Sequence, residues 1–283
     1  MLRIAIQSKG RLNEESMNLL QEVGVKLSFS KRTLLIPVKN FPAELLFLRD
    51  DDIPQAVADG VADIGIVGEN EFIEKKKNAE IVKRLGFSKC RLSLAIPKGE
   101  DYQNLSWFNS KKIATSYPVI LSEFLKKKAI KAKIHTISGS VEIAPGIGLT
   151  DAIFDIVSSG STLVNNQLKE VETVIHSEAV LIANTSLDKD KQQILRELVF
   201  RIEAVQTAKD KKYILLNAPN TALPAIFDIM PGTRSPTVVP LAQEGWSSVH
   251  AVLNEKSFWQ IIGELKDAGA EGILVLPIEK MIF

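Results

Sequence analysis

Residues 151–163 read DAIFDIVSSGSTL, and this stretch decides how the rest of the chain is interpreted. Its apolar residues 152–157 predict a buried strand that only Asp155 interrupts. A helix is expected to begin near Leu163, after a hydroxyl-rich turn made of Ser158, Ser159, Gly160, Ser161 and Thr162. A strand, a small-residue turn and a helix together hold phosphate in α/β proteins, because backbone N–H groups and the helix dipole converge on the anion. The stretch therefore predicts a phosphate-binding loop in an α/β fold.

Asp155 precedes this turn, and its carboxylate would repel a phosphate. It is better suited to accept hydrogen bonds from sugar hydroxyls or to hold a metal-bound water. An acid followed by a phosphate loop suggests a sugar phosphate as ligand. Taken alone, the stretch fits an ordinary strand-to-helix turn equally well, with Asp155 at the exposed end of the strand.

The composition predicts a soluble, cytoplasmic protein with no general affinity for nucleic acid or membranes. The 283 residues allow two or three domains, and 45% of them are hydrophobic. Lys and Arg number 35 against 34 Asp and Glu, so the net charge is only +1 and any anion must be bound locally. Cys90 is the single cysteine, which excludes a disulfide framework and a thiolate metal site. No signal peptide and no apolar run of transmembrane length is recognisable.

Two further segments near the N-terminus carry candidate anion-binding residues. Lys9 and Arg11 lie between a predicted strand at residues 2–6 and a helix, although a solvated connecting loop explains them as well. Arg49 ends another predicted strand, where α/β sheets place ligand contacts. The three aspartates 50–52 are interpreted as complements of a helix dipole, one of them capping the helix that contains Pro54, rather than as a metal site.

The order of predicted elements indicates two lobes followed by a small domain. A polar break at residues 97–101 is where we expect the crossing into a second lobe. We therefore predict lobe I at residues 1–97, lobe II at residues 98–173 with the phosphate loop, and a return to lobe I at residues 174–211. Residues 212–283 predict the order β-α-β-β-α-β, a ferredoxin-like unit, in which His250 is interpreted as structural.

Eight segments, in the same order along the chain, resemble ATP phosphoribosyltransferase, the first enzyme of histidine biosynthesis. They are QSKGRL (7–12), RDDDIP (49–54), DIGIVGEN (63–70), CRLSLA (90–95), IATSYP (113–118), GSVEIAP (139–145), DIVSSGSTL (155–163) and ILVLPIEK (273–280). The C-terminal unit resembles the regulatory domain of the long form of that family. The resemblance implies a two-lobed catalytic unit like a periplasmic binding protein, with the site between the lobes.

The resemblance also implies the chemistry. A ring nitrogen of the adenine of ATP attacks the anomeric carbon of phosphoribosyl pyrophosphate with inversion, and pyrophosphate leaves together with Mg²⁺. Positions in the matching motifs make Arg32, Arg49 and Lys9 the cations for the leaving group. Asp155 and Glu142 are implied to hold the ribose hydroxyls, beside the loop 158–162 for the 5-phosphate. That loop has Ser159 where the family usually has threonine, and the hydroxyl is kept.

Regulation is implied in the same way. Members of the family are inhibited by histidine bound to the C-terminal domain, and Asn217 and Thr237 lie in segments that match that site. The family shifts between dimer and hexamer, so a homo-oligomer is expected. Two other hypotheses stay open on the residues alone: a cytoplasmic sensor that closes on an anionic metabolite, and a phosphoribosyltransferase with a different acceptor base.

Overall fold

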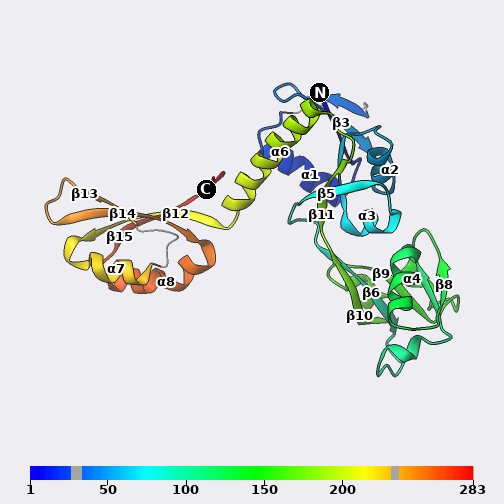
Figure 1. Cartoon of the computed structure of the whole chain (residues 1–283). Helices are drawn as coiled ribbons and strands as arrows, with labels where there is room; N and C mark the ends of the chain where they lie inside the picture. Colours follow the sequence, from blue (N-terminus) through cyan, green and yellow to red (C-terminus); the bar gives the residue numbers. More distant parts are fainter. Residues whose placement is uncertain (27–33, 231–235, 283) are drawn as a thin grey trace. The chain divides into compact units, whose positions relative to one another are not determined.

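The structure, a computed structural model, describes residues 1–26, 34–230 and 236–282 (Figure 1). It forms two compact units, Met1–Arg196 and Glu197–Phe283. Helix α6 (Lys189–Ala208) runs from the first unit into the second. Every helix in the described ranges is too short or too polar to cross a membrane.

The first sheet of the N-terminal unit has, among the described residues, six strands in the order β2-β3-β1-β4-β11-β5. Its strands are β1 (Leu2–Gln7), β2 (Leu35–Pro37), β3 (Ala43–Leu48), β4 (Ile64–Gly68), β5 (Ala79–Arg84) and β11 (Ala179–Asn184). Strand β1 pairs in parallel with β3 and β4, whereas β11 runs antiparallel to β4 and β5. The accompanying helices are α1 (Arg11–Glu22), η1 (Asp50–Asp52), α2 (Ile53–Ala58) and α3 (Glu69–Lys75).

The second sheet has the order β10-β6-β9-β7-β8, so the strand predicted at residues 152–157 lies at its centre. Its strands are β6 (Cys90–Pro97), β7 (Lys112–Thr115), β8 (Lys133–Thr136), β9 (Ala152–Val157) and β10 (Leu168–Ser177). Its helical segments are η2 (Leu105–Phe108), α4 (Pro118–Lys127), η3 (Val141–Ile143) and α5 (Ser161–Asn165). A central strand is buried on both faces, which explains why β9 is almost wholly apolar.

The chain passes between the two sheets twice, once between β5 and β6 and once between β10 and β11. Strand β6 pairs with β9 and β10 of the second sheet, so the first passage lies upstream of the polar break at 97–101 where we expected it. That break is instead a turn that follows β6. Proline and glycine mark a turn equally well within a lobe and between lobes, so the sequence could not separate the two cases.

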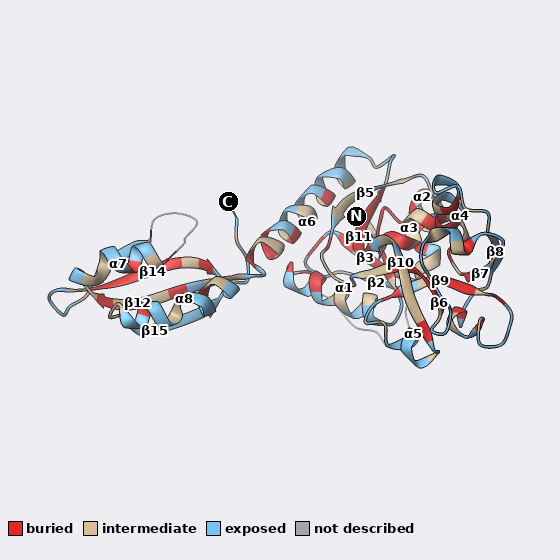
Figure 2. Ribbon diagram, turned by 90° about the horizontal axis from the view of Figure 1, so that it is seen from below, coloured by how far each residue is buried: buried red, intermediate tan, exposed pale blue. Residues whose placement is uncertain are grey.

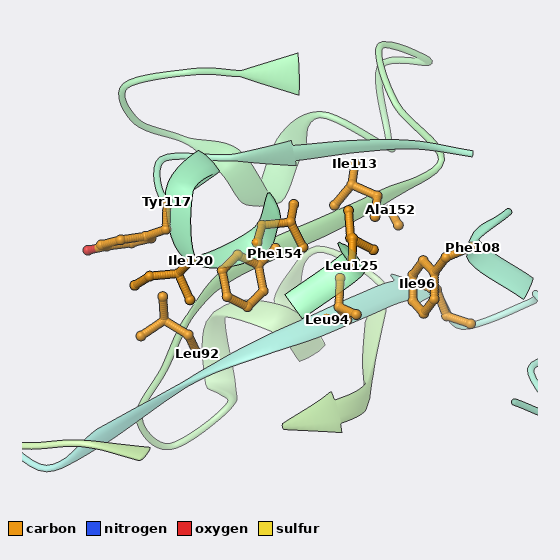
Figure 3. Packing of buried hydrophobic residues seen from close by; sticks show 11 residues of the cluster. Leu92, Leu94, Ile96, Phe108, Ile113, Tyr117, Ile120, Leu125, Ala152 and Phe154 are labelled. Atoms are coloured by element: carbon orange, nitrogen blue, oxygen red, sulfur yellow. The ribbon is translucent and has the colours of Figure 1, made fainter. Parts of the chain in front are cut away.

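An apolar cluster on one face of the second sheet fixes helix α4 against it (Figure 3). Phe108 and Phe154 are fully buried there, and Tyr117 lies at the edge of the cluster with its hydroxyl directed away from the other labelled side chains. Buried residues concentrate on the sheet strands and on the helix faces against them (Figure 2). This packing holds the start of α4 and the end of β9 in fixed positions.

The C-terminal unit has the predicted β-α-β-β-α-β order, which confirms the ferredoxin-like prediction. Its elements are β12 (Lys211–Pro219), η4 (Asn220–Ala222), α7 (Leu223–Ile229), β13 (Thr237–Pro240), β14 (Trp246–Asn254), α8 (Glu255–Asp267) and β15 (Glu271–Pro277). They form an antiparallel sheet in the order β13-β14-β12-β15, with α7 and α8 on one side of it (Figure 1). A core that includes Ile214, Leu216 and Phe258 joins the helices to the sheet.

Candidate active site

The predicted phosphate loop follows directly from the central strand β9 and leads into α5. Gly160 caps that helix in the left-handed conformation, with φ of 84°, which a residue with a Cβ adopts only at a cost. The Ser159 and Ser161 hydroxyls lie 3.0 Å apart, and both residues are exposed. The loop therefore offers hydroxyl groups and backbone N–H groups at an exposed strand end, as the sequence predicted.

Asp155 and Glu142 face the same region. Burial, and to a lesser extent the negative charge of Glu142, together raise the pKa of the Asp155 carboxyl to about 6. Glu142 belongs to η3, which follows β8, and β8 is separated from β9 only by β7 in the sheet. Two carboxylates in one partly buried place are costly unless a ligand supplies donors, so the pair is arranged to accept hydrogen bonds.

Asn70, Tyr117 and Ser177 form a third set of polar side chains in this region, contributed by both lobes. The sequence alone did not identify them. The Asn70 side-chain amide at the start of α3 donates to the Tyr117 hydroxyl at 3.1 Å, and its Oδ1 accepts from the Ser177 hydroxyl at 2.8 Å. Burial and the neighbouring Glu71 carboxylate raise the pKa of Tyr117. Asp155 acts on Tyr117 in the same direction, which places the tyrosine near the ribose-binding candidates. Asn70 and Tyr117 lie within two of the family-like motifs, and that was the available signal.

The cationic candidates lie on the first sheet. Lys9 follows β1 and Arg49 follows β3, and these strands are parallel neighbours. A 2.7 Å bond from the Ser8 N–H, just after β1, to the carbonyl of Leu48, the last residue of β3, joins them where they end. Both cations therefore leave the same edge of the sheet, and the Arg49 side chain is 78% exposed. Its Nε lies 3.2 Å from Asp51 Oδ1.

The aspartate that we predicted at the start of the helix containing Pro54 is present as Asp52, but its side chain does not cap the helix. Neither Asp52, at the cap position of α2, nor Arg49, before η1, makes a side-chain capping bond. Asp51 instead pairs with Arg49, because the turn η1 brings the two side chains back toward each other. Arg32 lies outside the described residues. Within the described ranges, no group of three or more Asp, Glu, His or Cys side chains is arranged to hold a metal ion.

A pocket of about 490 Å³ lies beside the phosphate loop and contains residues that the sequence did not indicate. Ser159, Gly160 and Ser161 line it together with Arg91 from β6 and Glu170 from β10. Arg91 lies in the CRLSLA motif, but nothing in the sequence connects it with residue 158 or residue 170.

The two candidates for histidine binding lie on strands that flank β14. Asn217 on β12 is opposite Ser248, and Thr237 on β13 is opposite His250. His250 contacts the Tyr213 hydroxyl at 2.6 Å and the Ser248 hydroxyl at 3.1 Å, in keeping with its structural interpretation. The strand pairing thus places Asn217 and Thr237 in one sheet, on either side of β14.

Comparison with known protein families gives two matches. Residues 49–204 match the family model described as ATP phosphoribosyltransferase. Residues 208–280 match the model described as the HisG C-terminal domain. Together they extend over the described parts of both units from Arg49 onward.

Individual proteins give the same result. ATP phosphoribosyltransferases of Azobacteroides pseudotrichonymphae and Bacteroides fragilis are 70% and 68% identical over 282 residues, covering 100% of each chain. A solved ATP phosphoribosyl transferase HisG:HisZ complex from Thermotoga maritima contains a chain that matches with a TM-score of 0.61 and 30% identity, covering 72% of this chain and 99% of that one. The chain therefore belongs to the ATP phosphoribosyltransferase family, in the form that carries the HisG C-terminal domain.

Proposed function

We propose that this chain transfers the phosphoribosyl group of phosphoribosyl pyrophosphate to N1 of the adenine of ATP. As a member of its family the chain is an enzyme, a glycosyltransferase of the first step of histidine biosynthesis. In the reaction the nitrogen lone pair forms the bond to the anomeric carbon, while the bond from that carbon to the pyrophosphate oxygen breaks. The electron pair of the broken bond leaves with pyrophosphate. The chemistry asks for positioning and for charge stabilisation rather than for a covalent nucleophile.

The observation that carries the proposal is the placement of Asp155 directly before the loop 158–162 on the central strand β9. The loop binds the 5-phosphate through its N–H groups and hydroxyls, and Asp155 and Glu142 accept hydrogen bonds from the ribose hydroxyls. With a pKa of about 6, Asp155 is ionised at neutral pH and can act as such an acceptor.

The leaving pyrophosphate is assigned to the cations of the first sheet. Arg49 and Lys9 leave the same sheet edge, and Arg49 is exposed, so both can reach a ligand. A guanidinium binds two phosphate oxygens at once and stabilises the charge that develops as the bond breaks. The same role is proposed for Arg32 from the family resemblance alone. Asp51 holds the Arg49 guanidinium until pyrophosphate competes for it.

Mg²⁺ enters this proposal as part of the substrate. The described residues offer no carboxylate cluster for a resident ion, whereas pyrophosphate oxygens are good ligands for a hard cation. The ion would neutralise the leaving group beside Arg49 and Lys9. Phosphoribosyl pyrophosphate therefore binds as its magnesium complex.

The regulatory proposal concerns residues 212–283, which bind histidine and lower the activity of the catalytic lobes. The presence of the HisG C-terminal domain and the positions of Asn217 and Thr237 on the two strands that flank β14 support this assignment. A cytoplasmic homo-oligomer that shifts between dimer and hexamer completes the proposal. Analytical ultracentrifugation with and without histidine tests the assembly.

The identity of the acceptor base does not follow from the fold, and an experiment can test it directly. The purified protein is incubated with phosphoribosyl pyrophosphate, Mg²⁺ and either ATP or GTP, and products are identified by mass spectrometry. The proposal predicts phosphoribosyl-ATP and an equal amount of pyrophosphate in the ATP sample only. Transfer to GTP at the same rate, or no transfer to ATP, would contradict it.

A further inference from the structure

Arg91 contacts the phosphate loop and a carboxylate at the same time. Its Nε and Nη2 donate to the two oxygens of Glu170 at 2.6 and 2.5 Å, from β6 to the neighbouring strand β10. Its third nitrogen, Nη1, donates to the Ser158 carbonyl at 3.2 Å. The side chains of Arg91 and Glu170 are 30% and 24% exposed, so the pair is partly shielded from water.

Glu170 is held as firmly as the arginine. Its Oε1 also accepts from the Ser93 hydroxyl at 2.7 Å and from the Thr173 hydroxyl at 3.2 Å. Arg91 and these hydroxyls lower the pKa of Glu170 to about 2, so the pair stays ionised throughout the range in which the protein works. A bidentate pair leaves a guanidinium little rotational freedom, and Nη1 is therefore aimed at the loop.

The bond to the Ser158 carbonyl has a geometric consequence. A peptide unit is planar and trans, so its C=O and the N–H of the next residue point in opposite directions. Holding the Ser158 carbonyl toward Arg91 therefore directs the Ser159 N–H away from Arg91. A loop can bind an anion only if its N–H groups point at the anion, and this one orientation is set from outside the loop.

We propose that Arg91, anchored by Glu170, is a positioning residue that fixes the peptide between Ser158 and Ser159 so that the loop is prepared to bind the 5-phosphate. The inference rests on the proposed function of the loop 158–162. Arg91 acts through the loop backbone and not through its charge, because Glu170 neutralises that charge within the pair. Its loss should weaken binding of phosphoribosyl pyrophosphate and leave the ATP site intact.

The test compares Arg91→Ala, Arg91→Lys and Glu170→Gln with the unaltered full chain. Binding of the magnesium complex of phosphoribosyl pyrophosphate is measured by titration calorimetry without ATP, and KM is then measured for both substrates. Arg91→Ala should weaken binding about tenfold or more, because a charge-assisted hydrogen bond and the order of the loop are lost together. The KM for ATP should change less than about twofold. Glu170→Gln should change the affinity for phosphoribosyl pyrophosphate and the KM for ATP in the same directions as Arg91→Ala does, but by smaller amounts.

Arg3→Ala is the matched control. Arg3 donates to Glu44 on the neighbouring strand at 2.7 Å and to the Val61 carbonyl at 2.9 Å, so it makes the same kind of contacts on the first sheet, away from the phosphate loop. Its removal should leave both KM values unchanged. A loss of phosphoribosyl pyrophosphate affinity equal to that of Arg91→Ala would reduce the effect to a general loss of stability and overturn the proposal.

The Arg91→Lys variant keeps the test informative if Arg91→Ala fails to fold. Lysine keeps the charge and can pair with Glu170, but a single ammonium cannot hold both carboxylate oxygens and aim at the Ser158 carbonyl in one plane. It should therefore fold normally and still bind phosphoribosyl pyrophosphate more weakly. Normal affinity in a folded Arg91→Lys and Arg91→Ala pair would refute the positioning role. An unaltered protein that neither binds this substrate nor forms phosphoribosyl-ATP would refute the proposed function itself.

Discussion

Asp155 lies in a partly buried environment that disfavours its ionised carboxylate. Burial and Glu142 raise its pKa from an ordinary value of 3.8 to about 6, so the folded protein holds the proton more tightly than the unfolded chain does. Ionised Asp155 therefore costs stability above about pH 6, the cost falls between about pH 6 and pH 4, and none remains at lower pH. A carboxylate held at such a cost is typical of a ligand site.

Asp155→Asn tests this cost and the role together. The amide carries no charge, so the variant should be more stable than the unaltered protein at about pH 7.5, by roughly 1–3 kcal/mol. It should also lose at least about tenfold in kcat/KM for phosphoribosyl pyrophosphate, because a charged acceptor for the ribose is lost. Thermal unfolding at about pH 7.5 and pH 5 provides the check, and the stability difference should shrink at the lower pH. A stability difference between the variant and the unaltered protein that is the same at both pH values would show that Asp155 is not desolvated.

Arg49→Ala addresses the leaving group. The side chain is 78% exposed and packs little, so the fold should persist while turnover falls about 100-fold or more. Steady-state kinetics and circular dichroism are sufficient measurements. A well-folded variant with normal turnover would remove Arg49 from the mechanism.

Site residues were predictable from the sequence where they lie together within one short motif. The hydroxyl-rich loop and Asp155 lie within one stretch, and the structure places them at one strand end. Arg91 and Glu170 are 79 residues apart, and only the pairing of β6 with β10 brings them together. One of the aspartates 50–52 was expected to cap α2, because acids at a helix start are favourable, but Asp52 at the cap position makes no side-chain capping bond and Asp51 pairs with Arg49.

At the scale of elements, helix α4 begins with a cap from another part of the chain. Tyr117 at the cap position makes no side-chain capping bond. The Glu74 carboxylate from α3 instead accepts from the Val119 and Ile120 N–H groups at 2.8 and 2.9 Å. A helix of the first sheet thus satisfies the N-terminus of a helix on the second, beside Tyr117. This contact links the two lobes at the candidate site.

Glu74→Ala should therefore lower the free energy of unfolding by roughly 1–3 kcal/mol, because two N–H groups at the helix start lose their acceptors. Glu123→Ala is the matched control, since Glu123 joins the same two helices through an exposed ion pair with Lys76. Its cost should stay within about 0.5 kcal/mol. Urea denaturation measures the free energy of unfolding of both variants. Equal losses would mean that the Glu74 cap stabilises the protein no more than an exposed ion pair does.

Elements with a strong apolar pattern were predictable, whereas their assignment to sheets was not. The strand at residues 152–157 and the β-α-β-β-α-β order were confirmed by the structure. The first passage between the sheets was misplaced, because β6 looks like any buried strand and its partners are remote in sequence. Strand pairing over 60 residues or more leaves no local trace for composition or periodicity to detect.

On the scale of the whole molecule, catalysis and regulation are assigned to separate stretches of the chain. The match to ATP phosphoribosyltransferase ends at residue 204 and the match to the HisG C-terminal domain begins at residue 208. The C-terminal unit has a core of its own, in which buried residues of β12, β14 and α8 pack together.

Deletion of residues 212–283 should accordingly abolish inhibition by histidine. Calorimetry should show histidine binding to the full chain and none to the truncated one. The unaltered chain, measured at the same protein concentration, is the reference for both. Histidine binding that survives the deletion would place the inhibitor site on the catalytic lobes.

The most direct test of the whole account is the initial rate of phosphoribosyl-ATP formation by the full chain as histidine is raised. The protein is mixed with ATP, phosphoribosyl pyrophosphate and Mg²⁺, and the product is followed by its ultraviolet absorbance. The account predicts steady product formation that histidine suppresses and that a histidine-free control maintains. Product formation indifferent to histidine would contradict the regulatory half of the account, and the absence of product would contradict its catalytic half.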